Sequence, residues 1–576
     1  MAHLNSPPSP PLASLATAEA RFGRAKTVAV IGAGISGVCT TAHLLKQGLS
    51  VTVFERSTIP GGVWHYDDRA SEDPPYPNQV PSLGDYRVSK RGEHAVAAGP
   101  TPPATPERRT VNGTGGTIKE GEEKEVEKDP EVSFSPPGPC YAGLKTNVPT
   151  TLMRSTLGSW PEGTGEFTSQ QHVELYVQTL AKNHGVQDVT LFQTRVDEVR
   201  KTADNSKWEV RSVTLIKTPT PHLVERISLF DLVVVASGHY NNPRIPEIPG
   251  LKQWKAAFPS RVIHSKQYRN PEHYRGQNLL VIGAGVSSVD ICRELDGVAA
   301  KAYQSVRGGS FDLPASMLPP SAERVAEVAE FVLQDSNQDN ISSSSSSREE
   351  TPRPIPGTAI LKDGRVLHDI HQVVLGTGYI TSYPFLSQLH NDTAHASEVN
   401  GSATTPSTLV SSDGEMAHNL HKDIFWMADP TLAFIGVPYY VATFSLFDFQ
   451  AQALARVFAG AAKLPALEEM RREYQDRVNE KGLGRGLHSL YGPNKEIEYV
   501  QDLVDWVNEG VADEQDKMLP HDEEWVRKYE EVKANRVAVF GESTFGQTKK
   551  KEVEVEASQG VVSEEVKKGL EEGIKG

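Results

Sequence analysis

One pattern occurs twice in this chain: an apolar run ends in a glycine-rich loop, and the loop leads directly into a helix-forming stretch. The first copy reads VAVIGAGISGVCTTAHLL and the second reads NLLVIGAGVSSVDICREL. Further apolar runs, among them VTVFE, DLVVVASG and HQVVLGTG, alternate with helical stretches. Short apolar strands joined through helices are typical of parallel sheets that are covered on both faces. We therefore predict an α/β fold built from two such units.

The glycines of the first copy have separate roles in binding a dinucleotide. Gly32 permits a tight turn, Gly34 lets a pyrophosphate approach the backbone, and Gly37 allows close helix packing. The N-terminus of the next helix offers N–H groups and a positive dipole end to the phosphates. Glu55, 18 residues after Gly37, ends the second strand, where a carboxylate accepts hydrogen bonds from a ribose diol. Because this acid would repel a 2′-phosphate, the site suits FAD or NAD.

The second copy carries the opposite charge at the corresponding place. Gly283 and Gly285 follow the strand, and Ser288 replaces the third glycine. Arg307 stands after the next short strand, and a guanidinium there suits a ribose 2′-phosphate. We predict NADP at this site, with NAD and a plain surface arginine as the alternatives. Two sites of opposite charge indicate hydride transfer from NADPH to FAD.

Composition excludes several classes of protein. The 576 residues include 59 basic and 74 acidic ones, a net charge of −15. Such an acidic surface repels phosphate backbones, so we expect no nucleic-acid partner. Three dispersed cysteines are too few for a disulfide framework, a zinc ribbon or a dithiol redox site. We predict no metal site either, because two HxxH pairs lack a third ligand motif: His368 with His371, and His418 with His421.

The ends of the chain and two internal tracts lack globular patterning. Residues 1–24 contain no apolar core of signal-peptide length, although sparse acids leave a mitochondrial presequence as an alternative. The longest apolar run, LAFIGVPYYVATFSLF, is broken by Gly436 and Pro438, so we expect no membrane anchor and a soluble, cytoplasmic protein. The tracts 69–138 and 336–354 lack hydrophobic periodicity, and we expect mobile surface insertions rather than core.

Six segments in order resemble class B flavin-dependent monooxygenases, and most of all the flavin-containing monooxygenase family. They are PGGVWHY (60–66), YAGLKTNVPTTLM (141–153), VVASGHYNNPRIPEIPGL (234–251), FPSRVIHSKQY (258–268), LGTGYITSYPFL (375–386), and DPTLAFIGVP followed by Gln450 through Gly460. The chain looks like a fungal-type, soluble member. It departs from the family pattern at four positions, where Ser260 replaces glycine, Val286 asparagine, His371 aspartate and Gly376 alanine.

The resemblance implies two Rossmann-like domains, with an NADP domain inserted in a discontinuous FAD domain. The implied order is a flexible tail (1–24), the first FAD part (25–68), a low-complexity insertion (69–138), the second FAD part (139–250), the NADP domain (251–368, with a disordered Ser-rich tract at 336–354), the closing FAD part with C-terminal helices (369–510), and a charged helical or disordered tail (511–576).

The resemblance also implies which residues contact the cofactors. In the family, the asparagine of the Thr-Asn-x-Pro segment lies beside the flavin and the nicotinamide, which makes Asn147 the candidate catalytic residue. From the residues alone, an Asn before Val-Pro is typical of a turn. The expected cofactor-binding residues are Gly32, Ala33, Gly34, Ile35, Ser36, Gly37, Glu55, Val63, Trp64, Thr146, Asn147, Gly283, Gly285, Ser287, Ser288, Val289, Asp290, Arg307 and Thr377.

The implied reaction is oxygenation of a soft nitrogen or sulfur of a small molecule, as in N,N-dimethylaniline monooxygenases. NADPH reduces FAD, and O₂ then forms a flavin C4a-hydroperoxide that the substrate attacks. Three alternatives stay open: a Baeyer–Villiger monooxygenase, a side-chain N-hydroxylase, and a non-catalytic FAD- and NADP-binding protein. Tyr268-Arg269, where Baeyer–Villiger enzymes have an aromatic residue and proline, favours heteroatom oxygenation. The substrate and the oligomeric state stay open.

Overall fold

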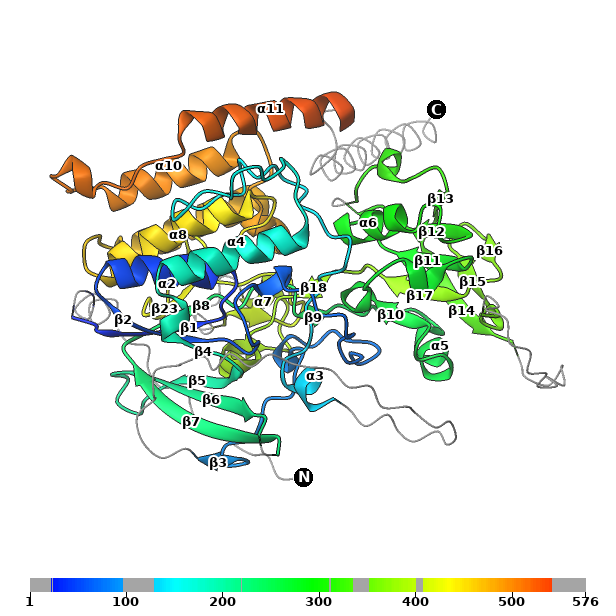
Figure 1. The fold of residues 1–576 in the computed structure, drawn as a ribbon, viewed down its shortest axis with the longest axis horizontal. Coiled ribbons are helices and arrows are strands. Elements are labelled where there is room, and N and C mark those ends of the chain that lie inside the picture. The colour runs from blue at the N-terminus through cyan, green and yellow to red at the C-terminus, as the bar shows by residue number, and fades with distance from the viewer. Residues whose placement is uncertain are drawn as a thin grey trace, which may run out of the picture. The chain divides into compact units, whose positions relative to one another are not determined.

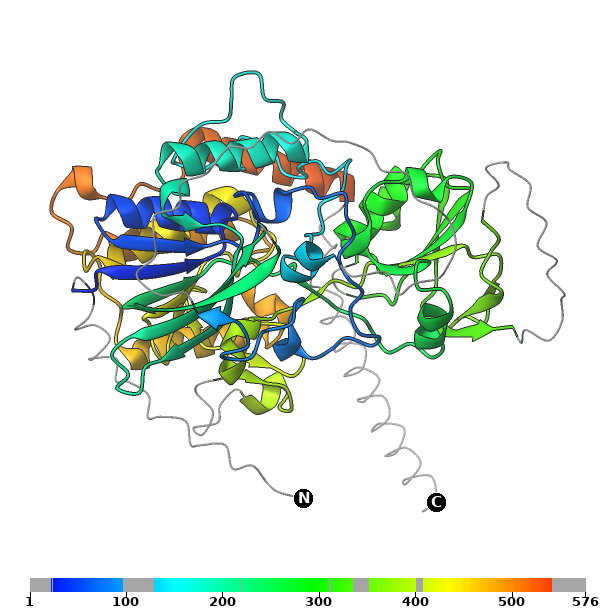
Figure 2. The same ribbon diagram turned by 60° about the horizontal axis from the view of Figure 1, so that its bottom comes forward.

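The computed structural model describes residues 22, 24–96, 129–218, 220–309, 312–334, 352–399 and 408–540. The described residues form two compact units (Figure 1 and Figure 2). The first unit contains those of Met1–Arg244, Lys266–Arg269 and Tyr379–Lys528, and the second those of Ile245–Ser265, Asn270–Gly378 and Tyr529–Gly576. The second unit thus interrupts the first along the chain, which confirms the predicted α/β fold with one domain inserted in another.

A seven-stranded sheet forms the centre of the first unit, in the order β21-β22-β23-β8-β1-β2-β4. The middle strands run parallel, with Val28 of β1 opposite Val51 of β2 and Leu232 of β8. The strands are β1 (Thr27–Ile31), β2 (Ser50–Phe54), β4 (Thr190–Leu191), β8 (Leu232–Val235), β21 (Leu420–His421), β22 (Phe425–Trp426) and β23 (Leu432–Phe434).

The two faces of this sheet are buried by different layers (Figure 1). Val28 and Val30 belong to a core cluster with helices α2 (Ile35–Lys46), α4 (Gln170–Asn183) and α8 (Thr443–Phe458). Ala29 and Ile31 pack on the other face with a four-stranded sheet in the order β3-β7-β6-β5. Strands buried on both faces read as apolar runs without alternation, as this sequence does. The second sheet consists of β3 (Ala95–Val96), β5 (Thr194–Lys201), β6 (Trp208–Ile216) and β7 (His222–Phe230).

The C-terminal helices extend the core of the first unit. Met470 of α9 (Leu467–Lys481) and Leu503 of α10 (Lys495–Val507) are buried in the cluster of α2 and α8. Helix α11 spans Glu523–Phe540, and only its first residues, up to Lys528, belong to the first unit. There, Nε1 of the buried Trp525 donates a hydrogen bond to the Leu152 carbonyl at 3.1 Å. Smaller elements are α3 (Pro130–Phe134), α7 (Ala396–Val399), β9 (Asn242–Pro243), β18 (Tyr379–Ile380), β19 (His390–Asn391) and β20 (Val410–Ser411).

The second unit repeats the parallel arrangement on a smaller scale. Its five-stranded sheet has the order β10-β17-β11-β12-β13, and a three-stranded sheet in the order β14-β15-β16 accompanies it. The strands are β10 (Val262–His264), β11 (Asn278–Ile282), β12 (Lys301–Ser305), β13 (Ala322–Val325), β14 (Val328–Leu333), β15 (Gly357–Leu361), β16 (Val366–Leu367) and β17 (Gln372–Leu375), with helices α5 (Leu251–Ala257) and α6 (Val286–Glu294).

The prediction that the whole of 69–138 lies outside the core is wrong for its two ends. Residues 69–96 and 129–138 are packed on the first unit: β3 pairs with β7, and Phe134 of α3 is buried against β6. Asp85 makes ion pairs with Arg56 and Lys266, two residues remote from it in sequence. This segment is held by buried polar contacts, which leave no hydrophobic periodicity for sequence reasoning to detect. Residues 97–128 lie outside the described part.

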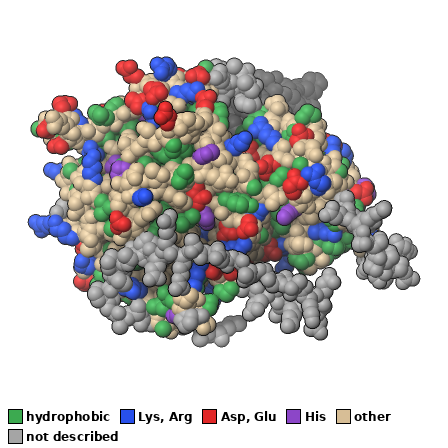
Figure 3. Space-filling model, in the orientation of Figure 1, with side chains coloured by type: hydrophobic (Ala, Val, Ile, Leu, Met, Phe, Trp, Pro, Cys, Tyr) green, Lys and Arg blue, Asp and Glu red, His purple; other side chains and the backbone are tan. Residues whose placement is uncertain are grey.

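Most of the other segments expected to be flexible also lie outside the described residues. They are residues 1–21, most of the Ser-rich tract 336–354, and the end of the chain from residue 541. Within the described residues, no helix is long and apolar enough to cross a membrane. On the face drawn in Figure 3, acidic and basic side chains are interspersed, which is typical of a solvated surface.

Candidate active site

The first glycine-rich loop connects β1 to α2, and two of its glycines are required by geometry. Gly32 has a φ of +103°, and a Cβ there would lie 2.6 Å from the Ala236 carbonyl oxygen. A Cβ on Gly37 would lie 1.9 Å from the Gly32 carbonyl oxygen. Only glycine fits at either position, so the sequence signature reflects the shape of this turn.

The start of α2 is open to an anion. Its N-cap residue is Gly34, which offers no capping side chain, and no acid occupies the first turn. The N–H groups at the beginning of the helix therefore have no side-chain acceptor from the cap. Val38, one turn along, already donates its N–H to the Gly34 carbonyl at 2.9 Å.

Two further glycines bring bare backbone against this helix start and form a cradle. A Cβ on Gly62 would lie 2.8 Å from the Gly34 Cα, and one on Gly436 would lie 2.7 Å from the Ser36 Oγ. Gly62 begins the 3₁₀ turn Gly62–Trp64, which places Val63 and Trp64 next to the loop. Such a cradle, lined by backbone N–H groups and with no side chain on Gly34, Gly62 or Gly436, fits a pyrophosphate.

Glu55 is held at the same loop. Its buried carboxylate accepts hydrogen bonds from the Ala33 N–H at 2.7 Å and from the Ser57 N–H at 2.8 Å. Each carboxylate oxygen retains a further lone pair, which suits the hydroxyl groups of a ribose. The structure thus brings together the first loop, Glu55, Val63 and Trp64, all predicted cofactor-binding residues.

The second glycine-rich loop has the same geometry with one change. Gly283 has a φ of +112°, and a Cβ there would lie 2.4 Å from the Gly376 carbonyl oxygen. Gly285 is the N-cap of α6 without a capping side chain, and a Cβ there would meet open space. Ser288 is fully buried, and its Oγ donates to the Gly376 carbonyl at 3.5 Å. Of the other predicted residues in α6, Ser287 is exposed, Val289 is buried and Asp290 is half-buried.

Arg307 lies on a segment that is tied to this loop at both ends. The Gly283 N–H donates to the carbonyl of Ser305 at the end of β12, and the Leu313 N–H donates to the Ala284 carbonyl. Arg307 lies between these two attachments and is exposed. Among the residues that the structure describes, none makes an ion pair or hydrogen bond with its guanidinium. An unpaired cation beside an anion-binding helix start fits a phosphate on a ribose.

The remaining predicted residues are divided between the units. Thr146 and Asn147 belong to the first unit, where the Thr146 N–H donates to the Thr168 carbonyl at 2.9 Å. Asn147 is exposed on the segment that leads to α4. Thr377 follows β17 in the second unit and is half-buried.

Sequence reasoning missed a buried charge cluster next to Glu55. Arg56 Nη1 and Nη2 donate to the two Asp85 oxygens at 3.1 and 3.2 Å. Lys266 is buried, and its Nζ donates to Asp85 at 2.8 Å and to the Asn241 carbonyl at 2.7 Å. Burial alone would raise the pKa of Asp85, but the charges of Arg56 and Lys266 outweigh it and lower the pKa to about 2. The signal in the sequence was the basic residue directly after Glu55.

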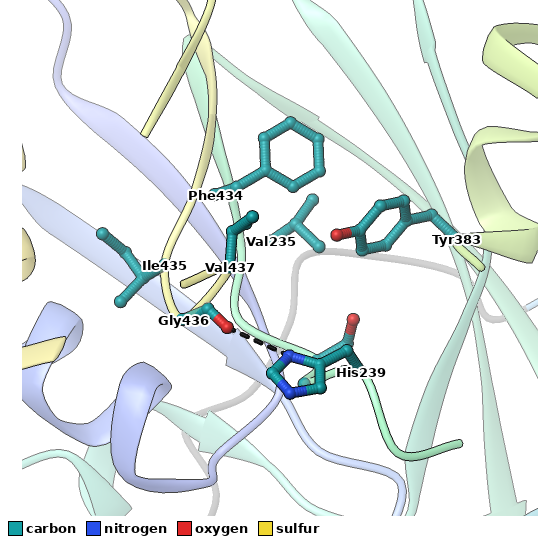
Figure 4. Close-up of a pocket in the computed structure, with 9 residues that line it drawn as sticks. Val235, His239, Tyr383, Phe434, Ile435, Gly436 and Val437 are labelled. Carbon is teal, nitrogen blue, oxygen red and sulfur yellow. Dashed lines mark hydrogen bonds between the residues drawn. The ribbon is translucent and has the colours of Figure 1, made fainter. Parts of the chain in front are cut away.

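A small hollow opens beyond the carboxyl ends of β8 and β23 (Figure 4). His239 points into it, and its Nδ1 lies 3.2 Å from the Gly436 carbonyl oxygen, to which the neutral tautomer with its proton on Nδ1 donates. Burial, and then the charge of Arg485, lower the pKa of His239 to about 4, so the ring is neutral near pH 7. The lining residues are Val235, Ser237, Gly238, His239, Tyr383, Phe434, Ile435, Gly436 and Val437.

The cysteines lack the features of nucleophiles. Cys39, Cys140 and Cys292 are all buried free thiols. Burial raises the pKa of Cys140 to about 12, and its Sγ donates weakly to the Trp64 carbonyl at 3.7 Å. A thiol with so high a pKa is not a thiolate at neutral pH.

Two family models match most of this chain. The model of flavin-binding monooxygenase-like proteins matches residues 140–317 and 322–512, and that of NAD(P)-binding Rossmann-like domains matches residues 30–84. The second match extends to residue 84, which agrees with the packed state of the segment after residue 69.

Curated relatives and solved structures carry related names. Flavin-containing monooxygenase ustF2 of Aspergillus flavus is 39% identical over 84% of this chain and 91% of its own length. Flavin-containing monooxygenase iboF of Amanita muscaria is 29% identical over 84% of this chain and 88% of its own. The structure of S-allyl-L-cysteine S-oxygenase from Allium sativum superposes with a TM-score of 0.58 at 21% identity, covering 90% of this chain and 94% of that one. The structure of Tmm from Pelagibacter also superposes with a TM-score of 0.58, at 20% identity, covering 89% of this chain and 91% of that one.

Proposed function

The chain belongs to the family of flavin-binding monooxygenase-like proteins, and from this premise we propose that it oxygenates a soft nitrogen or sulfur atom of a small molecule. It is an oxidoreductase that uses FAD and NADP. The proposed reaction consumes NADPH and O₂. Tertiary amines of the N,N-dimethylaniline type and thioethers are the substrates that test it first.

The observation that carries the assignment of the cofactors is the contrast between Glu55 and Arg307. In each unit, the glycine-rich loop leads into a helix whose start lacks a side-chain cap, and the next strand follows that helix. Glu55 and Arg307 come after this next strand. Glu55 suits a free ribose diol, so we assign FAD to the first unit. Arg307 suits a 2′-phosphate, so we assign NADP to the second. The bare cradle of Gly34, Gly62 and Gly436 supports FAD at the first loop.

Bound FAD supplies the redox chemistry that joins NADPH and O₂. The residues of this chain bind and orient the cofactors and the substrate, and they exclude water from the site. Glu55 fixes the ribose, and the start of α2 binds the pyrophosphate. We assign Asn147 the task of holding hydrogen bonds at the oxygenation site, since an amide both donates and accepts without a charge. The neutral ring of His239 adds no charge to the hollow beside Gly436.

Two residues argue against the competing functions. Arg269 is buried and donates to the carbonyls of Lys266, Tyr268 and Arg69, so it has a fixed structural place where a Baeyer–Villiger enzyme has proline. Ser260, which replaces a glycine of the family pattern, would favour a non-catalytic protein if it distorted the backbone. It is exposed in a turn and does not adopt a left-handed φ, so serine is compatible with that turn.

A substrate panel tests the proposed function. NADPH consumption, H₂O₂ and product are measured together for a thioether, a tertiary amine, a primary amine and a ketone. We expect oxygenated thioether or tertiary amine with little H₂O₂. An ester from the ketone would support Baeyer–Villiger chemistry, a hydroxylated primary amine would support N-hydroxylation, and no NADPH consumption with any compound would support a non-catalytic role.

A further inference from the structure

Aromatic side chains gather beyond the carboxyl ends of two adjacent parallel strands of the first unit. His239 and Tyr240 follow β8, and Tyr439 and Tyr440 follow β23. The ring centroid of His239 lies 4.3 Å from that of Tyr240 and 4.6 Å from that of Tyr439. Tyr440 contacts Tyr491 with centroids 5.8 Å apart. We name these five residues the aromatic cluster; ligands of α/β sheets bind at this edge.

Three rings of the aromatic cluster are partly exposed, while His239 and Tyr439 are half-buried. Tyr240, Tyr440 and Tyr491 expose 38%, 41% and 45% of their surfaces, which is high for such large rings. Tyr440 also has a φ of +58°, a backbone conformation that a bulky residue rarely adopts. Exposed rings on strained backbone are typical of binding sites, because packing alone would not maintain them.

Arg485 adds a positive charge to this cluster. Its guanidinium carbon lies 4.7 Å from the centroid of the Tyr439 ring. Among the described residues, no carboxylate makes an ion pair with Arg485, and its buried Nε has no hydrogen-bond partner. A partly buried cation without an anion is unfavourable, because the desolvation of its charge is not compensated.

His239, Tyr240 and Tyr440 carry no charge near neutral pH. The pKa of His239 is lowered to about 4 by burial and by Arg485. Burial raises the pKa of Tyr240 to about 12 and also raises that of Tyr440. Together, the aromatic cluster and Arg485 therefore present aromatic faces and a positive charge. It adjoins the cradle of the first loop, because Gly436 contacts both His239 and Ser36.

We propose that the aromatic cluster binds the substrate and that Arg485 selects substrates that carry a carboxylate beside an apolar or aromatic body. The planar guanidinium donates two parallel hydrogen bonds to a carboxylate, and the Tyr rings stack on the apolar body. This proposal rests on the proposed function, because it names the class of substrate that would be oxygenated.

Two isosteric probes test the charge alone: 4-(methylthio)benzoate and its neutral counterpart 4-(methylthio)benzamide. Binding to the FAD-loaded protein is measured by calorimetry, and sulfoxide formation is measured separately with NADPH. We expect the wild type to bind the acid at least about tenfold more tightly than the amide. Arg485→Gln should remove this preference, and Arg485→Lys should keep part of it. Arg472→Gln is the matched control, because Arg472 is an exposed arginine on α9 that pairs only weakly with Glu469 at 3.7 Å.

Equal affinities of the wild type for the two probes would overturn the proposal. An equal loss of affinity for both probes in Arg485→Gln would also overturn it, because it would indicate a structural role of Arg485. Loss of FAD, or a raised KM for NADPH, would assign Arg485 to a cofactor instead and overturn the proposal as well. Selective, Arg485-dependent binding of the acid without sulfoxide would support the carboxylate site while contradicting the proposed oxygenation of sulfur.

Discussion

In each unit, the third glycine position of the loop faces one residue of a neighbouring strand end. Glycine occupies the loop position in the first unit and the facing position in the second. In the first unit, Gly37 faces Ala236, whose Cβ lies 3.6 Å from the position of a Cβ on Gly37. In the second unit, Ser288 faces Gly376, and a Cβ on Gly376 would lie 2.0 Å from the Ser288 Oγ. Each pair contains one glycine, so the serine that replaces the third glycine of the motif, Ser288, is compensated by Gly376, which replaces the alanine of the family pattern.

We therefore expect Gly376→Ala to destabilise the second unit and Ser288→Gly to restore it. The added methyl group overlaps Ser288, and overpacking of this kind costs about 1–3 kcal/mol. Thermal unfolding of the two single variants and the double variant measures the coupling. If the double variant is no more stable than Gly376→Ala, the two residues are not a compensating pair.

Arg307 is predicted to select NADPH over NADH. Arg307→Gln removes a charge-assisted hydrogen bond worth about 1.5–3 kcal/mol, so the KM for NADPH should rise about tenfold or more. The KM for NADH should stay nearly constant, because NADH lacks the 2′-phosphate. Arg275→Gln provides a control at an exposed arginine of the same unit that pairs with Glu272. Equal weakening of both coenzymes would contradict the assignment.

Asn147 is predicted to separate oxygenation from hydride transfer. Asn147→Ala should retain FAD and still consume NADPH, because we assign cofactor binding to the glycine-rich loops and not to Asn147. Product should fall by about an order of magnitude, with H₂O₂ accounting for the difference, since local hydrogen bonds protect the oxygenation step. Asn147→Asp should be at least as impaired, because an anion opposes the charge that develops. If Asn147→Ala couples NADPH consumption to product as tightly as the wild type does, Asn147 is only a turn residue.

At the scale of elements, Asp85 attaches the segment after residue 69 to β2 and to residues 266–269. Asp85→Asn leaves the buried Lys266 and the half-buried Arg56 without their acid, and such a loss costs about 3–5 kcal/mol. Denaturant unfolding at pH 7 measures this difference.

The same substitution gives a pH dependence of defined sign. The pKa of Asp85 is lowered from 3.8 to about 2 on folding, so its contribution is complete above the unfolded pKa and is lost as the pH falls towards 2. The stability difference between the wild type and Asp85→Asn should therefore shrink between about pH 5 and pH 2. A difference that is constant over this range would show that the ion pairs do not stabilise the segment.

The parts of the fold that could be predicted are those that depend on local backbone shape. Gly32, Gly37 and Gly283 stand where a side chain does not fit, so the turn dictates the residue. The packing of residues 69–96 could not be predicted, because Asp85 and Lys266 meet only after the chain has folded. The aromatic cluster was missed for the same reason, since its members come from three distant segments.

At the scale of the whole molecule, the second unit interrupts the first, and each unit contains one glycine-rich loop. The predicted division assigns FAD to the discontinuous first unit and NADP to the inserted second unit. In this proposal, the charged residue after the next strand suits the cofactor of each unit: Glu55 after β2 suits FAD, and Arg307 after β12 suits NADP. The central claim is that both cofactors serve one reaction, the transfer of one oxygen atom from O₂ to a soft atom of the substrate.

Isotopic labelling tests this claim most directly. The FAD-loaded protein is incubated with NADPH, 4-(methylthio)benzoate and ¹⁸O₂ in unlabelled water, and the sulfoxide is analysed by mass spectrometry. We predict one ¹⁸O atom in each sulfoxide molecule and one NADPH consumed for each. Sulfoxide without the label, or NADPH consumption that yields only H₂O₂ with this thioether and with N,N-dimethylaniline, would contradict the account.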